Sequence, residues 1–175
     1  MKRLVLFFGL STLISMSLLA QTIKVVSYPQ FVSNSLLVFS KYVNWPLNHK
    51  NGDFIITIIG NPDVYKELSS NIHTMKVGSQ NIIVRYYNKV NEVQDFSHIL
   101  FLSENNSSTI KKVTDKVGSE NTLIVTSSEG LLTYGAGINF IPVDGLMKFE
   151  ISKGNISKRN LEIHSWLEKM AAKQG

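Results

Sequence analysis

The stretch FSKYVNWPLNHKNGDFIITIIG, from Phe39 to Gly60, holds a helix end, a turn and a strand. Pro46 ends the helix, because the residue before a proline is driven out of the α region. Residues 54–59 are almost continuously apolar and β-branched, which is typical of a strand buried on both faces of a parallel sheet. Asn44-Trp45-Pro46 is either a binding site or a structural corner. Since a central strand follows, we expect the corner, with Trp45 in the core.

Strand and helix patterns alternate outward from this stretch. Apolar residues at helical spacing predict a helix over residues 29–43, and Asn61 and Pro62 suit the start of a second helix. Short apolar, β-branched runs predict strands over residues 54–59, 81–87, 98–102, 122–126, 135–141 and 146–151. Residues 105–108 are expected to cap a third helix, which presents Ile110, Val113 and Val117 on one side. Ile163, Trp166, Leu167 and Met170 predict an apolar stripe on a closing helix.

This alternation predicts an α/β fold built as a three-layer sandwich. We expect a largely parallel central sheet with helices on both faces. Residues 146–151 alternate between apolar and charged side chains, so they are expected to form an antiparallel edge strand with one wet face.

The first 20 residues have the pattern of a secretory signal peptide. A basic start, Met1-Lys2-Arg3, precedes an apolar run that ends at Ala20, a small-residue cleavage point before Gln21. The alternative is an uncleaved anchor, but the run is just short of the roughly 20 residues that span a bilayer comfortably. We therefore expect a periplasmic mature chain, residues 21–175, that folds as a single domain.

Charge and cysteine content exclude several kinds of function. The formal net charge is +5, and loss of Lys2 and Arg3 with the leader leaves about +3 on the mature chain. Such a mildly basic surface is not a nucleic-acid footprint, so no nucleic-acid partner is expected. The chain contains no cysteine, which excludes disulfides, thiol chemistry and a lipoprotein anchor.

No catalytic or cofactor pattern is complete. Gly135-Ala136-Gly137 begins like a dinucleotide loop, but Phe140 replaces the third glycine and a strand follows, so we expect a tight bend. The phosphate-binding G-x-x-x-x-G-K-[ST] loop and the G-x-S-x-G elbow are both missing. The histidines lack metal-ligand spacing and are expected to be structural or at the surface; they are His49, His73, His98 and His164. We predict no enzyme activity, cofactor or metal.

One ligand site follows from the fold class alone. In open α/β sheets, ligands bind beyond the carboxyl ends of the parallel strands. The residues expected there are small or polar: Gly60, Asn61, Ser103, Glu104, Asn105, Ser127 and Ser128. Two of these segments adjoin expected helix N-termini, which favour anions. The alternative is that these residues are only caps and turns.

Several segments together carry a resemblance to a known family. Residues 37–46 read LVFSKYVNWP, residues 97–103 read SHILFLS and residues 135–141 read GAGINFI. With residues 54–60, 148–151 and 161–171, they resemble in the same order the YfiR-like family of bacterial periplasmic domains. The resemblance covers about residues 29–172 and implies that residues 161–171 form a closing helix.

Five positions depart from the family pattern, one of them Gly137, which replaces a bulky residue. Ser97 stands where many members carry a cysteine, so the redox-linked disulfide behaviour of those members is missing here. Ala136 replaces a second glycine, which puts in doubt any ligand contact that needs a bare backbone at that position. His164 and Trp166 depart from a serine-and-leucine pattern, so this surface is expected to pair differently.

The resemblance implies a regulatory, non-enzymatic protein. The family's namesake binds the outer domain of a membrane diguanylate cyclase, lowers cyclic-di-GMP and restrains biofilm formation, and other members are joined to, or encoded near, sensor histidine kinases. Such a membrane signalling protein is therefore the expected partner, together with a homodimer, because namesake members dimerise. The alternative is a periplasmic small-molecule binding module that uses the carboxyl-end residues.

Two aromatic residues are candidates for contact with a protein partner. Tyr42 and Trp166 are expected on helices, and aromatic side chains are enriched among interface anchors. For Trp166 a place in the core is the open alternative.

Overall fold

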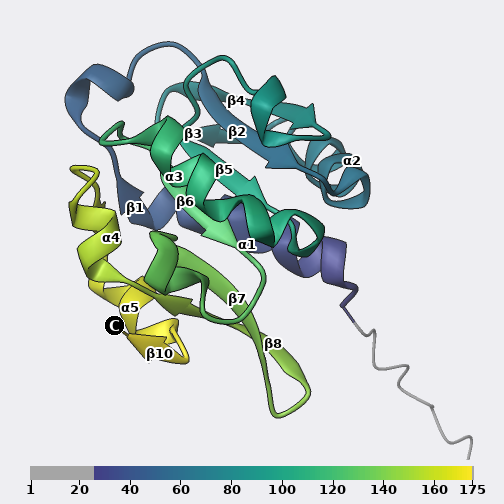
Figure 1. Cartoon of the computed structure of the whole chain (residues 1–175). Helices are drawn as coiled ribbons and strands as arrows, with labels where there is room; N and C mark the ends of the chain where they lie inside the picture. Colours follow the sequence, from purple (N-terminus) through teal and green to yellow (C-terminus); the bar gives the residue numbers. More distant parts are fainter. Residues whose placement is uncertain (1–25, 175) are drawn as a thin grey trace, which may run out of the picture.

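A computed structural model describes residues 26–174, without the side chains of Glu104, Asn105, Ser107 and Gln174. Its main sheet has eight strands in the order β10-β8-β7-β6-β5-β2-β4-β3 (Figure 1). These strands are β2 (Phe54–Ile59), β3 (Lys76–Val77), β4 (Gln80–Tyr87), β5 (Ile99–Leu102), β6 (Leu123–Thr126), β7 (Ile138–Val143), β8 (Leu146–Ile151) and β10 (Lys173–Gln174). A separate antiparallel pair joins β1 (Val43–Asn44) to β9 (Glu162–Ile163).

The centre of the sheet is parallel, as predicted. β2 pairs in parallel with both β4 and β5, and the parallel run continues through β6 to β7. β8 pairs antiparallel with β7, which confirms its predicted direction, but β10 lies on its outer side. The five parallel strands have the doubly wound order, in which the direction of winding changes between β2 and β5.

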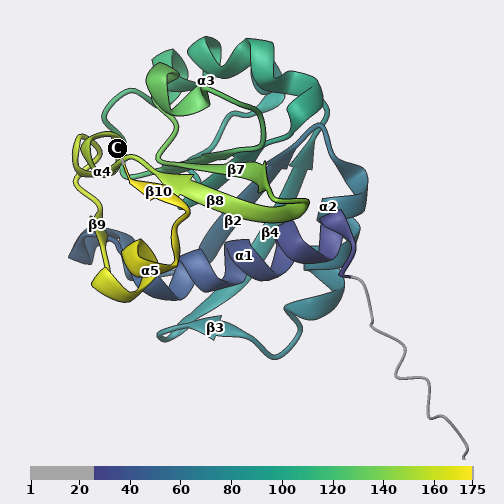
Figure 2. The ribbon, with the colours of Figure 1, turned by 90° about the horizontal axis from the view of Figure 1, so that it is seen from below.

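Helices cover both faces of the sheet, which confirms the three-layer prediction. Figure 2 shows α1 (Tyr28–Tyr42), α2 (Pro62–Asn71) and α5 (Ser165–Met170) on one side, and α3 (Ile110–Val117) on the other. The remaining helix is α4 (Lys153–Ser157). Short 3-10 turns complete the connections: η1 (Leu47–His49), η2 (Val90–Glu92), η3 (Glu104–Thr109) and η4 (Leu131–Tyr134).

β2 separates two hydrophobic clusters, which explains its continuous apolar sequence. Ile56 and Ile58 belong to the cluster under α1 and α2, whereas Ile59 belongs to the cluster under α3. In the larger cluster Phe39 of α1 stacks on Phe140 of β7, with ring centroids 5.9 Å apart. Both faces of β2 are therefore covered by hydrophobic clusters and not by water.

Asn44-Trp45-Pro46 forms the predicted corner. Trp45 is only 4% exposed, and its Nε1–H donates to the Asn121 carbonyl at 3.0 Å. Its ring meets the Phe54 ring edge-on at 5.0 Å, so the corner is anchored to the first residue of β2. α1 ends at Tyr42, and the two residues before Trp45 form β1.

The prediction of one long closing helix was wrong. Residues 162 and 163 form β9, which pairs with β1, and α5 begins only at Ser165. His164 separates the two elements, because its Nδ1 accepts the Trp166 N–H at 3.1 Å. The helical spacing of apolar residues had placed Ile163 on the closing helix. Its pairing with Val43 of β1 makes it part of a strand instead. The third helix also differs, because residues 105–108 lie in η3 and Thr109 precedes α3 without a side-chain cap.

Gly60 occupies the position at which the chain leaves β2. Its φ is 78°, and an added Cβ would overlap the Asn106 side chain. Gly52 provides a matched control, because its φ is 74° and nothing lies within 4 Å of the Cβ position.

We expect Gly52→Ala to lower the free energy of unfolding by about 1 kcal/mol, through the left-handed backbone alone. Gly60→Ala should lower it by about 3 kcal/mol, because the clash adds to the backbone cost. Urea denaturation measures both variants. Equal losses would contradict the close packing of Gly60 against Asn106.

Candidate functional site

At the winding change between β2 and β5, the predicted crevice holds the Asn106 side chain. Gly60 follows β2 and Ser103 follows β5, and the Asn106 side chain lies against both segments. The Asn106 N–H donates to the Ser103 carbonyl at 2.9 Å, which holds η3 over the gap. The structure therefore brings Gly60 and Ser103 together, but around a protein side chain.

Asn61 acts as a cap in this structure. Its Oδ1 accepts the Val64 N–H at 3.0 Å, at the start of α2. Ser103 is buried, and its hydroxyl has no hydrogen-bond partner among the described residues. Glu104 and Asn105 lie in η3, and their side chains are outside the described part of the structure.

Ser127 and Ser128 border a cavity of about 310 Å³ that lies beyond the end of β6 and alongside β7. Tyr28, Phe140 and Met147 supply aromatic and apolar walls. The predicted ligand residues therefore divide into a part packed against Asn106 and a part that borders a cavity.

Asn139, a buried asparagine that sequence reasoning missed, links β6, β7 and β8. The Asn139 Oδ1 accepts the Thr126 hydroxyl at 2.7 Å and the Ser128 N–H at 3.2 Å. Its Nδ2 donates to Glu150 at 2.8 Å. Because Asn139 lies within an apolar strand pattern, only its lack of β propensity could have drawn attention to it.

Tyr42 and Trp166, the two predicted partner residues, lie together. Their rings stack with centroids 4.5 Å apart, and Trp166 remains 42% exposed, so it is not a core residue. An apolar groove of about 340 Å³ runs beside them, between α1 and α5. Phe31, Val38, Phe149, Trp166, Leu167 and Met170 supply its apolar lining. We call this surface, with Tyr42 beside it, the aromatic groove.

The family model described as YfiR/HmsC-like matches residues 29–172, nearly all of the described chain. The chain belongs to the YfiR/HmsC-like family. No curated protein matches it. Within residues 26–174, no helix is long and apolar enough to cross a membrane, and no three His, Cys, Asp or Glu residues group as metal ligands. The predicted signal peptide lies outside the described residues.

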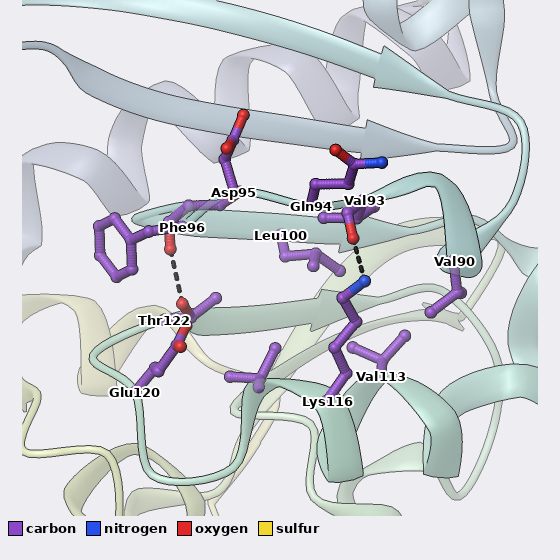
Figure 3. Close-up of a pocket in the computed structure, with 12 residues that line it drawn as sticks. Val90, Val93, Gln94, Asp95, Phe96, Leu100, Val113, Lys116, Glu120 and Thr122 are labelled. Carbon is purple, nitrogen blue, oxygen red and sulfur yellow. Dashed lines mark hydrogen bonds between the residues drawn. The ribbon is translucent and has the colours of Figure 1, made fainter.

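This YfiR/HmsC-like chain has a smaller cavity, of about 150 Å³, at the amino ends of β5 and β6 (Figure 3). Leu100 and Val113 supply apolar walls. The Lys116 ammonium donates to the Val93 carbonyl, and the Thr122 hydroxyl donates to the Ser97 carbonyl at 2.6 Å. Because Lys116 and Thr122 already bond to backbone carbonyls, we interpret the cavity as a gap in the packing of α3 against the loop after η2.

Ser97 stands where many YfiR-like members carry a cysteine, and its hydroxyl has a hydrogen-bond partner. It is buried, and its hydroxyl forms a 2.6 Å hydrogen bond with the Thr57 hydroxyl on β2. The pair joins two adjacent segments on the α3 side of the sheet. Serine at this position therefore has a structural role, in place of the thiol.

His98 is a buried structural histidine, as predicted. Its Nδ1 accepts the Ile55 N–H at 3.0 Å, so Nε2 carries the proton and donates to the His49 carbonyl at 2.8 Å. Burial lowers the pKa of His98; the His49 carbonyl raises it and the nearby His49 ring lowers it further. A second proton would have to displace the Ile55 bond, so the fold requires neutral His98.

The depressed pKa predicts a loss of stability in acid. Above about pH 6.5 the ring is neutral in both the folded and the unfolded chain, and the full stability is present. Below that value the unfolded chain binds a proton that the folded chain resists, so stability falls with pH until the folded pKa is passed.

Urea denaturation between pH 7.5 and 5 measures this dependence. We expect His98→Gln, which keeps one acceptor and one donor, to flatten the pH dependence. His73→Gln, at an exposed position, should leave it unchanged. An identical pH slope in the wild type and His98→Gln would contradict the assignment.

Proposed function

We propose that this chain is an exported, non-enzymatic regulatory protein that contacts a membrane signalling protein. Family membership supports this function, because the namesake of the family regulates a diguanylate cyclase. The partner would be a diguanylate cyclase or a sensor histidine kinase. Export rests on the predicted signal peptide.

The main structural support for this proposal is that the aromatic groove exposes apolar side chains. Trp166 and Met170 are exposed beside Phe31 and Phe149, so apolar side chains from α1, β8 and α5 meet at one surface. Contiguous exposed apolar patches mark interaction sites, and tryptophan and tyrosine are enriched among the residues that dominate binding energy. Partner binding would shift the signalling protein toward one state only by its differential affinity for that state.

We expect Trp166→Ala to weaken partner capture from the cell envelope at least tenfold. The variant should lose only about 1 kcal/mol of folding stability, because its ring is partly in water and forms one aromatic stack. Leu146→Ala is the matched control, since Leu146 is 66% exposed on the β7–β8 hairpin outside this groove. Crosslinking capture followed by mass spectrometry measures the loss.

A cellular measurement tests the regulatory part. Deleting the gene should change cyclic-di-GMP and biofilm formation, and Trp166→Ala should reproduce the deletion while Leu146→Ala complements it. An unchanged cyclic-di-GMP level, together with no captured membrane partner, would defeat the proposal.

A second candidate function is small-molecule binding at the carboxyl ends of the strands. The cavity at Ser127 and Ser128 favours it, because this part of the predicted crevice is open. In a thermal-shift screen, ligands of this site should lose their effect in an Asn61→Ala, Ser103→Ala, Ser127→Ala triple variant. Each shift is compared with the variant's own baseline, because loss of the Asn61 cap alone costs about 1 kcal/mol. Ligands that the triple change leaves unaffected would exclude this crevice.

A further inference from the structure

A cavity of about 370 Å³ opens beside the corner at Trp45. It lies at the amino end of β2, whereas Gly60 and the predicted ligand residues lie beyond carboxyl ends. Trp45 and Phe54, both buried, form an aromatic floor. Residues 77–80 of the β3–β4 hairpin form the opposite wall. Gln80 ties this wall to the corner, because its Nε2 donates to the His49 carbonyl at 3.2 Å.

The rim of this cavity is cationic. Lys41 and Lys50 both line it and are exposed, and none of the other lining residues is charged. Neither lysine forms an ion pair within the described part of the chain. The Lys50 ammonium donates to the Asn44 Oδ1 at 2.7 Å, which leaves its other protons for a ligand.

We propose that this cavity binds a small organic anion. Its carboxylate or phosphate would lie between Lys41 and Lys50, and a flat apolar body would lie over Trp45 and Phe54. Ligand sites combine apolar walls with polar groups that fix orientation. Here Val43, Trp45, Phe54 and Val77 are the apolar lining residues, and Lys41 and Lys50 are the charged ones. Hydrogen bonds between two charged groups are also stronger than those between neutral ones.

The helix end explains only part of this arrangement. Lys41 lies in the last turn of α1, where a cation interacts favourably with the carbonyl end of the helix. Lys50 follows η1 and has no such reason to face the cavity.

Trp45 provides a direct measure of binding. The chain has two tryptophans, so Trp166→Phe leaves Trp45 as the only indole. Benzoate and phenyl phosphate should change its fluorescence saturably, with a Kd on the order of 1 mM or tighter. Benzyl alcohol and benzylammonium, of similar shape but neutral or positive, should bind at least tenfold more weakly.

Lysine variants in the same background locate the site. Lys41→Met and Lys50→Met should each raise the Kd for benzoate about tenfold, which corresponds to about 1.4 kcal/mol. Lys112→Met makes the same charge change at an exposed position on α3 and should leave the Kd unchanged. Circular dichroism confirms that each variant is folded.

Three results would overturn the proposal. They are no saturable response to either anion, equal binding of benzyl alcohol and benzoate, and equal weakening by Lys112→Met and Lys50→Met. Preference for phenyl phosphate over benzoate would assign a phosphate group to the ligand, and the reverse would assign a carboxylate. Because the readout needs no partner protein, it is independent of the regulatory function.

Discussion

Burial of β2 on both faces determines how the layers and the loops around it are arranged. A strand without a wet face needs a helical layer above it and another below, and both hydrophobic clusters contain residues of β2. The chain must then enter and leave β2 through closely packed turns. At the amino end Trp45 packs on Phe54, and at the carboxyl end Gly60 packs against Asn106. The corner and the crevice that holds Asn106 are therefore two consequences of one buried strand.

The layers could be predicted from sequence because the signals that define them are local. Apolar runs and the Asn61 cap each act within a few residues of the chain, and the structure agrees with both. The first helix ends at Tyr42, ahead of the predicted stop at Pro46, because residues 43 and 44 pair with β9. The prediction of the closing helix failed because residues 162 and 163 pair with β1, more than 100 positions earlier in the chain. Hydrophobic periodicity cannot show that Ile163 pairs with Val43 of β1. This tertiary pairing makes residues 162 and 163 a strand instead of the start of a helix.

The candidate site was predictable only in part, for a similar reason. The rule that ligands collect at carboxyl ends pointed to Ser127 and Ser128, which border a cavity, and to Gly60, which packs against Asn106. Whether a gap between strands is open depends on side chains from other segments, here Asn106. Tyr42 and Trp166 were candidate partner contacts, with a core position left open for Trp166. Their stacking arises from the arrangement of β1, β9 and α5. The lysine-rimmed cavity joins three segments that no short motif connects.

The anion cavity and the aromatic groove are adjacent, and hydrogen bonds join them. Lys50 donates to Asn44, and Asn44 donates to Glu162 of β9 at 3.3 Å. The His164 N–H, one residue beyond β9, donates to the Tyr42 carbonyl at 2.9 Å. An anion bound to the remaining protons of the Lys50 ammonium would share that group with Asn44, so it would lie next to the first of these bonds. Coupling between the sites would require β1 and β9 to have two arrangements that both ligands bias. If they do, partner binding must change anion affinity by the same factor as the anion changes partner affinity.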